Sequence, residues 1–232
     1  MRGLRIVIVS DLHGGSRFID EDKIAHVVSL ANAAKPDLVL LTGDYLATSP
    51  HGGAGRVPIA AVARAFKALH APLGTYAVLG NHDIWFDADR VISAFKAAGT
   101  PVLENTARVI PTPRGPLYLV GIGDAYTRHA DPARAVAQLP AGARAICFTH
   151  SPDIFPGLSP ACRLTIAGHT HGGQVYLPLL GRLVVPSRYG QRYAAGLIHE
   201  NGHDLFVSTG IGTSIYPVRF LVPPEVSVLD LR

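Results

Sequence analysis

Apolar runs of strand length alternate with helix-like patterns through the first half of the chain. Three runs predict strands, and the first two are apolar enough to be buried on both faces: 4–10, 38–42 and 75–79. Apolar residues at helical spacing predict helices between and after these runs: 20–34, 58–69 and 87–98. Pro36 and Gly99 are stop signals for the first and the last of these helices. Such alternation is typical of an α/β protein.

The second half of the chain is richer in predicted strands. They are expected around Arg108 and at 117–122, 144–148, 164–167, 196–200 and 203–208. A short helix is predicted to begin at Asp131-Pro132, and Asn201-Gly202 is a strong signal for a hairpin turn. No repeat and no change in composition marks a boundary, so we expect a single domain that spans residues 1–232.

Polar residues with metal-binding side chains follow five of the predicted strands. The stretches are Asp11-Leu12-His13, Gly43-Asp44, Gly80-Asn81-His82-Asp83, Thr149-His150 and Gly168-His169-Thr170-His171. Because the C-terminal ends of strands form the usual ligand crevice of an α/β sheet, we expect these stretches to meet there. Residues two apart in an extended segment also face the same side. The predicted cluster contains Asp11, His13, Asp44, Asn81, His150, His169 and His171, with His82 and Asp83 beside it.

Seven candidate ligands are too many for one metal ion and fit a pair of ions. Mixed carboxylate, imidazole and amide donors suit Mn, Fe or Zn, whereas Mg or Ca would favour oxygen alone. Two ions about 3.5 to 4 Å apart, bridged by a carboxylate, serve in-line displacement at phosphorus, and Asp44 is the natural bridge. With Asp11 and Asp44 as the charged ligands, roughly two positive charges remain to attract a phosphate. The ions would also bring the pKa of a bridging water toward about 7, giving a hydroxide that attacks phosphorus.

Each stretch has a structural alternative, since an aspartate at a strand end can cap a helix and a single histidine can be a core residue. Five stretches in order argue against a coincidence of such alternatives. The remaining histidines lie outside these five stretches and are expected to be exposed or structural: His26, His51, His70, His129, His199 and His203. His129 is the main rival to His150, but it does not follow an apolar strand. A GxSxG motif is absent from the sequence.

Composition places the chain among globular proteins. Of its 232 residues 48% are hydrophobic and 16% are charged, which suits one large buried core. No apolar run approaches the roughly 20 residues that span a bilayer, and no secretory signal is evident, so we expect a cytoplasmic location. Cys147 and Cys162 are expected to be reduced core residues. The net charge of +4 permits an anionic substrate or surface, but the arginines are scattered and no nucleic-acid partner is expected.

Together and in this order, the five stretches resemble the calcineurin-like metallophosphoesterase superfamily. The resemblance implies an α/β fold, a four-layer αββα sandwich with mixed sheets. It implies one metal ion on Asp11, His13, Asp44 and His171, and another on Asp44, Asn81, His150 and His169. It also implies that His82 contacts the phosphate and assists the leaving group, with Asp83 orienting it. The expected activity is hydrolysis of a phosphate ester or diphosphate. The alternative, a protein-binding scaffold of the same fold, would not need the complete ligand set.

Residues after the histidine pair resemble a bacterial subgroup of this superfamily. The resemblance rests on residues 168–174 followed by the stretches 177–182, 217–220 and 223–225. The subgroup includes cell-envelope phosphoesterases and UDP-2,3-diacylglucosamine pyrophosphatases. Between residues 177 and 193, apolar residues are mixed with Arg182, Arg188 and Arg192. This segment is expected to form either a strand pair at the sheet edge or a rim that binds a second phosphate and an acyl or nucleoside group. We expect a phosphate-containing or lipid-linked substrate, with which a peripheral membrane contact is compatible.

Overall fold

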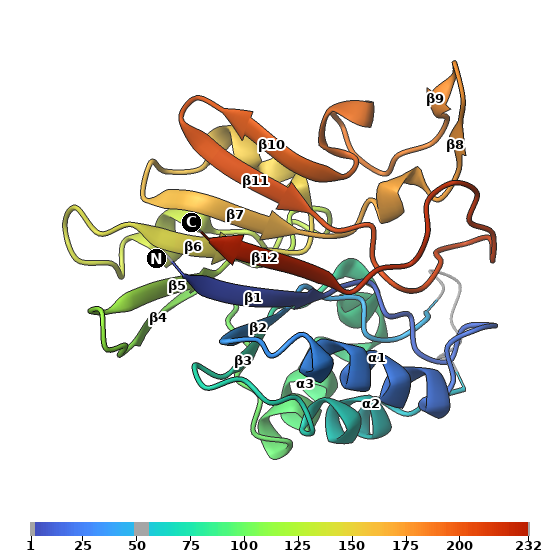
Figure 1. Cartoon of the computed structure of the whole chain (residues 1–232), viewed down its shortest axis with the longest axis horizontal. Helices are drawn as coiled ribbons and strands as arrows, with labels where there is room; N and C mark the ends of the chain where they lie inside the picture. The colour runs from blue at the N-terminus through green and yellow to red at the C-terminus, as the bar shows by residue number, and fades with distance from the viewer. Residues whose placement is uncertain (1–2, 49–55, 232) are drawn as a thin grey trace.

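Two β-sheets packed face to face form the middle of the molecule, and helices cover both outer faces (Figure 1). The computed structural model describes residues 3–48 and 56–231, so the loop that contains His51 lies outside the described residues. The layers follow the order helices, sheet, sheet, helices. The α/β sandwich with mixed sheets expected from the sequence is therefore confirmed.

The first sheet has the order β12-β1-β2-β3 and carries the three longest helices on its outer face. Its strands are β1 (Leu4–Val9), β2 (Leu38–Leu41), β3 (Thr75–Ala77) and β12 (Ser227–Leu231), and its helices are α1 (Glu21–Ala33), α2 (Ile59–Phe66) and α3 (Asn81–Ala97). β1, β2 and β3 are parallel, whereas β12 is antiparallel to β1. Val7 and Val9 pack in the core under the helices, and Ile6 and Ile8 pack between the sheets. Burial of both faces of β1 explains its continuous apolar run.

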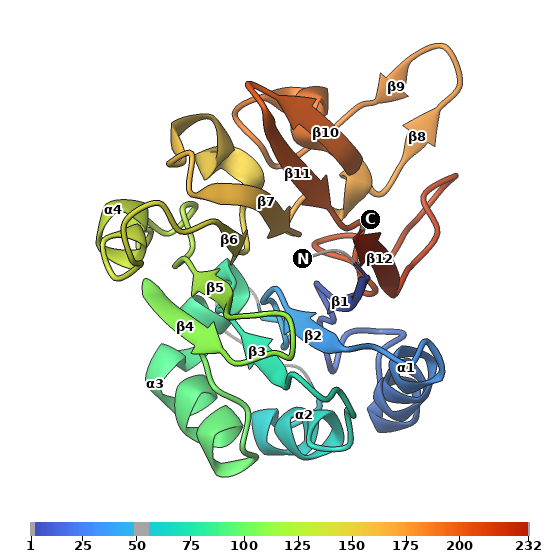
Figure 2. The same cartoon turned by 60° about the vertical axis from the view of Figure 1, so that its left-hand side comes forward.

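The second sheet has the order β10-β11-β7-β6-β5-β4 (Figure 2). Its strands are β4 (Thr106–Ile110), β5 (Leu117–Gly121), β6 (Ala145–Phe148), β7 (Cys162–Ala167), β10 (Gly196–Glu200) and β11 (His203–Val207). The four inner strands are parallel, and both edge strands are antiparallel to their neighbours. The outer face is covered by α4 (Pro132–Val136) and the short 3-10 helices η1 (Pro152–Gly157) and η3 (Gly190–Tyr193). Phe148 and Ile166 face the first sheet and complete the central core.

Helix α3 begins earlier than the sequence analysis predicted. It starts at Asn81, and its backbone leaves the helical conformation at Asp87. The Asp87 carboxylate accepts a hydrogen bond from the backbone N–H of Arg90 at 3.0 Å, so Asp87 caps the second part of the helix as expected. The extra turn before it was missed because its first residues were assigned to the site alone. Strand β12 was missed as well.

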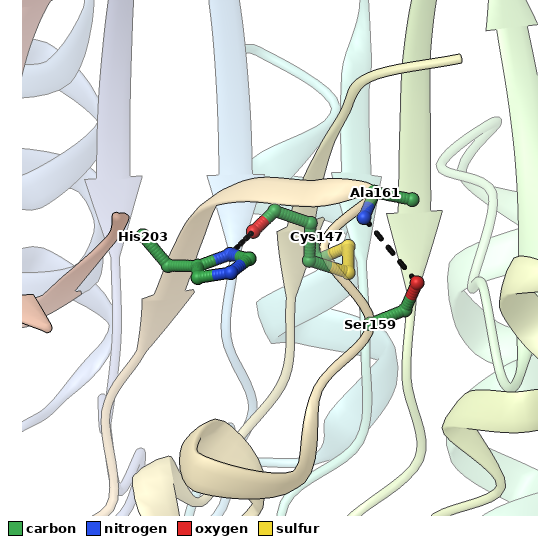
Figure 3. The surroundings of a disulfide bond; sticks show 5 residues. Cys147, Ser159, Ala161 and His203 are labelled. Atoms are coloured by element: carbon green, nitrogen blue, oxygen red, sulfur yellow. Dashed lines mark hydrogen bonds between the residues drawn. A yellow bond between two sulfur atoms is a disulfide. The ribbon is translucent and has the colours of Figure 1, made fainter. Parts of the chain in front are cut away.

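Cys147 and Cys162 form a disulfide, which corrects the expectation that both are reduced (Figure 3). The two residues lie on the adjacent strands β6 and β7, with their Cα atoms 5.4 Å apart. The pairing register of these strands shifts between Ala145 and Ile146, next to the disulfide. The sequence could not show this because the two residues are 15 positions apart and become neighbours only when the sheet forms.

The segment after residue 175 forms its own small ladder instead of extending the second sheet. Strands β8 (Tyr176–Leu177) and β9 (Gly181–Arg182) pair antiparallel and project from the body of the molecule (Figure 1). The strand pair expected there is present, but the ladder is a separate two-stranded sheet. The hairpin at Asn201-Gly202 is confirmed, with φ of 51° and 74° at the two turn residues. Among the described residues, no helix has the length and apolar character needed to cross a membrane.

Candidate metal centre

The C-terminal ends of β1, β2, β3, β6 and β7 meet at one side of the two sheets (Figure 1). The first sheet supplies the stretches that begin at Asp11, Gly43 and Gly80, and the second sheet supplies those around His150 and His169. All nine side chains named from the sequence are buried there: Asp11, His13, Asp44, Asn81, His82, Asp83, His150, His169 and His171. The structure therefore brings the predicted cluster together at the junction of the sheets.

Four of these side chains form a first group that could hold a metal ion. Donor atoms of Asp11, His13, Asp44 and His171 all lie within 4.8 Å of one another. The Nε2 atoms of His13 and His171 are 3.1 Å apart, and Nε2 of His171 is 3.4 Å from Oδ1 of Asp11. Nε2 of His13 is 3.5 Å from Oδ2 of Asp44. Two carboxylates and two imidazoles thus converge on one small volume.

A second group shares Asp44 with the first. Donor atoms of Asp44, His150 and His169 also lie within 4.8 Å of one another. Nε2 of His150 is 3.3 Å from Oδ2 of Asp44 and 3.0 Å from Nδ1 of His169. Oδ1 of Asn81 approaches the same Nε2 atom at 3.1 Å and adds an amide oxygen. Oδ2 of Asp44 therefore lies between the two groups.

Burial keeps most of these imidazoles in the form that binds metal. It lowers the pKa of His13 to about 3, against the opposing charge of Asp44. Burial, helped by the charge of Arg219, also lowers the pKa of His171 to about 3. The pKa of His169 is lowered by burial and by the charge of His150. Neutral imidazoles at neutral pH are available as ligands.

Asp44 and His150 behave as an ion pair in the chain alone. Burial alone would raise the pKa of Asp44, but the charge and hydrogen bond of His150 outweigh it and hold that pKa well below its usual value. Burial opposes protonation of His150, yet the charge of Asp44 raises the pKa of His150 well above its usual value. The buried carboxylate thus requires a positive charge beside it. A divalent cation fits this donor set and would take the place of the proton on His150.

Five of the seven candidate ligands have a left-handed backbone. The φ angles are 51° at Asp11, 48° at His13, 57° at Asp44, 70° at His169 and 50° at His171. This conformation costs about 1–2 kcal/mol per residue, although Asp and His tolerate it better than branched residues. Gly43 also has a positive φ, 94°, and a Cβ there would collide with the backbone nitrogen of Gly80. The tight turns that end these strands thus adopt strained backbone conformations, and these conformations place the ligand side chains in the cluster.

His82 lies beside the centre without belonging to either group. Its Nε2 is 4.0 Å from Oδ2 of Asp44, and its ring centroid is 4.6 Å from that of His13. Its other nitrogen, Nδ1, faces Thr48 and lies 3.1 Å from the Thr48 hydroxyl oxygen and 3.4 Å from the Thr48 backbone nitrogen. With Nδ1 facing Thr48, Nε2 is the nitrogen directed at the centre.

Asp83 makes its hydrogen bonds to the strand ends, whereas the sequence analysis expected it to orient His82. Its carboxylate accepts from the backbone N–H groups of Asp44, Tyr45 and Gly80 at 2.8, 2.9 and 2.9 Å. Burial, together with the charge of Asp44, raises the pKa of Asp83 to about 8. Because Asp83 lies in the first turn of α3, its side chain reaches back to the strand ends and fixes their backbone. Thr48, which the sequence analysis missed, contacts Nδ1 of His82 instead.

Three further residues support the ligands from outside. Nδ1 of His150 donates to the carbonyl oxygen of Thr42 at 2.8 Å, which directs Nε2 toward the centre. Ser10 donates to the carboxylate of Asp11. Arg219 brings Nη2 to 3.4 Å from Nδ1 of His171 while donating to the carbonyl oxygens of Thr209 and Gly212. Ser10 and Thr42 are the last residues of predicted strands, but nothing in the sequence marked them as partners of the ligands.

Comparison with known proteins places this geometry in context. A sequence profile described as calcineurin-like phosphoesterase matches residues 4–173. The chain is 34% identical to phosphodiesterase YaeI of Escherichia coli, over 98% of this chain and 82% of that protein. It is 30% identical to the uncharacterized metallophosphoesterase YkuE of Bacillus subtilis, over 99% of this chain and 79% of that protein.

Solved structures show the same fold at low sequence identity. The chain resembles a 5'-nucleotidase precursor from Thermus thermophilus with a TM-score of 0.54 and 14% identity, over 89% of this chain and 49% of that one. It resembles the phosphopantetheinyl hydrolase PptH of Mycobacterium tuberculosis with a TM-score of 0.52 and 12% identity, over 94% of this chain and 92% of that one. These likenesses concern the arrangement of the sheets and helices.

Proposed function

This chain belongs to the calcineurin-like phosphoesterase family of metal-dependent phosphoesterases, and from that membership we propose that it hydrolyses a phosphodiester or diphosphate bond at a centre of two metal ions. The observation that carries the proposal is the position of Asp44, whose carboxylate belongs to both groups of candidate ligands. A shared carboxylate between two clusters of donors is the arrangement of a bridged pair of ions.

The donor set indicates which residues would hold each ion. One ion would be bound by Asp11, His13, Asp44 and His171, and the other by Asp44, Asn81, His150 and His169. Imidazoles together with carboxylate and amide oxygens favour manganese, iron or zinc over magnesium and calcium. When bound, such a pair supplies Lewis acidity toward a phosphate and lowers the pKa of water between the ions.

His82 is the residue placed to move a proton. Its Nε2 lies at the edge of the centre, 4.0 Å from Oδ2 of Asp44. We propose that Nε2 donates a proton to the oxygen of the leaving group as the bond to phosphorus breaks. Thr48 holds the ring by contacting Nδ1, and Asp83 holds the turn from which His82 projects.

A hollow beside the centre offers room for the rest of the substrate. It has a volume of about 390 Å³ and is lined by Ala125, Tyr126, Asp153, Pro186, Ser187 and Arg188. The Tyr126 ring lies 5.0 Å from the ring of His169, so the hollow shares a wall with the metal centre. We propose that Arg188, an exposed side chain 3.5 Å from Asp153, binds a second phosphate or other anionic group there.

The other two arginines of the expected rim have partners elsewhere. Arg182 donates to the backbone oxygen of Gly172 at 2.8 Å, and Arg192 pairs with Glu200 at 2.7 Å. Among the three, Arg188 alone lines the hollow, so it is the one that we expect to govern substrate choice. Arg188→Ala should raise the KM for a diphosphate substrate by about tenfold and leave that for a small chromogenic diester unchanged, as fits one exposed charge-assisted contact. Arg192→Ala is the matched control, and equal KM changes in both variants would contradict the assignment.

Metal analysis combined with an activity assay tests the proposal. The purified protein, loaded with manganese, iron or zinc in turn, should bind about two ions per chain and hydrolyse a chromogenic phosphodiester. Replacing Asn81 by alanine should weaken one ion selectively, because Asn81 belongs to the second group alone. A protein that binds no metal, hydrolyses no phosphoester and instead captures a protein partner would be the scaffold alternative, and the proposal would be wrong.

A further inference from the structure

Two neighbouring loops expose most of the large apolar side chains on the surface of this protein. We call residues 177–185 and 213–221 together the apolar rim. Nine of the 16 exposed large apolar side chains among the described residues lie in the rim: Leu179, Leu180, Leu183, Val184, Ile215, Tyr216, Val218, Phe220 and Leu221. Leu179 is fully exposed and Ile215 is 89% exposed. Apolar surface gathered in this way marks a site of interaction rather than ordinary exposure.

Hydrogen bonds hold the two loops of the apolar rim together. The side chain of Gln174 accepts from the backbone N–H of Ser214 at 2.6 Å and donates to the carbonyl oxygen of Tyr216 at 3.1 Å. The backbone of Phe220 pairs with Gln174 and Tyr176 on both sides, at 2.8 and 2.9 Å. Figures 1 and 2 show both loops projecting from the same part of the molecule. These hydrogen bonds thus fix the two loops of the apolar rim relative to each other.

Backbone conformation at the rim adds a second observation. Leu179, Ile215 and Leu221 have φ angles of 73°, 62° and 53°, in the left-handed region that glycine and asparagine adopt at less cost. For branched Ile215 this conformation is a marked outlier. The fold thus presents apolar side chains outward at positions where a glycine would be more stable. Contact of these apolar side chains with a partner outside the chain would account for their presence at these positions.

The stretches of sequence that include the apolar rim are rich in arginine. The segments 154–199 and 205–224 contain five arginines and neither aspartate nor glutamate. Two of these arginines, Arg188 and Arg192, pair with Asp153 and Glu200, which flank the first segment. Arg182 and Arg219 donate to backbone oxygens, so their positive charge is not neutralised by those bonds. An anionic surface would complement this region.

We propose that the apolar rim docks the protein on a membrane that contains anionic lipids. Both loops project from the body of the molecule, so a folded protein partner would need matching pits for both, whereas fluid acyl chains adapt to any shape. Apolar side chains with tyrosine, phenylalanine and arginine in the same loops are the composition of interfacial anchors. The first loop leaves the metal centre only a few residues after His171, so docking would bring the centre close to the lipid phosphates. The docking itself does not depend on the proposed hydrolysis.

Sedimentation with lipid vesicles tests the docking without any substrate. Wild type should sediment with vesicles of phosphatidylcholine and phosphatidylglycerol, and more weakly with phosphatidylcholine alone, because arginines near an anionic surface add to binding. The double variant Leu179→Ser and Ile215→Ser should bind the mixed vesicles about a hundredfold more weakly, at about tenfold for each side chain withdrawn from the apolar layer. Val109→Ser with Leu197→Ser is the matched control, since both residues are exposed on the edge strands β4 and β10.

Three results would overturn the docking proposal. Wild type could remain in solution with every vesicle composition, or the rim variant could sediment as well as wild type. Wild type could also form a dimer that the rim variant dissociates, with no vesicle binding, which would make the apolar rim an interface between copies of this chain. Thermal unfolding of each variant checks that the fold is kept. Because vesicle binding is measured without turnover, failure of the proposed hydrolysis would leave this result readable.

Discussion

Replacing His82 by alanine should remove most of the turnover while leaving the metal content unchanged. His82 is buried but lies outside both groups of candidate ligands, with Nε2 4.0 Å from the shared carboxylate of Asp44. A positioned histidine that transfers a proton typically contributes a factor of about 10² to 10⁴ in rate. At about 1.36 kcal/mol for each factor of ten, that loss corresponds to about 2.7–5.4 kcal/mol of transition-state stabilisation.

The identity of the leaving group makes this prediction specific. If Nε2 of His82 protonates the leaving oxygen, a poor leaving group such as an alkoxide needs that proton, whereas a nitrophenolate hardly does. The turnover rate of the variant should therefore fall by the full factor of about 10² to 10⁴ on an alkyl ester and by much less on a nitrophenyl ester. Steady-state kinetics on both esters, with metal content measured on the same preparations, gives the comparison. His70→Ala serves as the control because His70 is exposed on the surface of the molecule.

Equal losses on both esters would refute proton donation and leave His82 with a role in binding the phosphate. Loss of one metal ion from the His82→Ala protein would refute the division between ligands and proton donor. In that case Nε2 would have to belong to the metal shell in the loaded protein.

Three further predictions concern the centre and the core. Asp44→Ala should lose both ions and all activity together, because Asp44 belongs to both groups of candidate ligands. Elemental analysis of the variant measures its metal content, and retention of one ion would contradict a shared carboxylate. Replacing Cys147 and Cys162 by alanine should lower the free energy of unfolding by about 3 kcal/mol in urea titrations, as expected for a loop of this length, and reductant should have the same effect on wild type only. Burial raises the pKa of Glu104 from 4.5 to about 7, so the folded chain holds a proton that the unfolded chain loses, and stability should fall as pH rises through that window. Glu104→Gln should abolish this loss, on the order of 3 kcal/mol, and an unchanged pH profile of urea unfolding would contradict the assignment.

The strand ends were predictable because burial and chemistry leave separate marks in the sequence. The residues of β1 and β2 are apolar on both faces, since both sheets and helices cover them, and such runs stand out from any flanking polar residue. Asp11 and Asp44 come immediately after the ends of those runs. The parallel arrangement then places every such end on one side of the sheets. Local pattern and global topology therefore agree at this site, and the cluster could be assembled from the sequence.

The features that were missed depend on contacts between distant parts of the chain. Cys147 and Cys162 become neighbours through the register of β6 and β7, which no local pattern encodes. Thr48 reaches His82 only because the loop after β2 passes the start of α3. Asp83 could have been assigned to its backbone partners, since an acidic residue at the third position of a helix commonly reaches back to the preceding turn. Its proximity in sequence to His82 favoured the ring as its partner.

Backbone strain and buried charge at the centre share one physical explanation. Five ligands hold left-handed backbones, and two carboxylates are buried against imidazoles whose nitrogen atoms approach one another at 3.0 and 3.1 Å. In the chain alone, each of these features opposes folding. A bound cation would replace these close contacts with ligand bonds and neutralise the carboxylates, so its binding free energy would offset the strain. The arrangement therefore lowers the stability of the chain alone and favours the binding of metal. The same requirement places polar residues directly after apolar strands, where they stand out in the sequence.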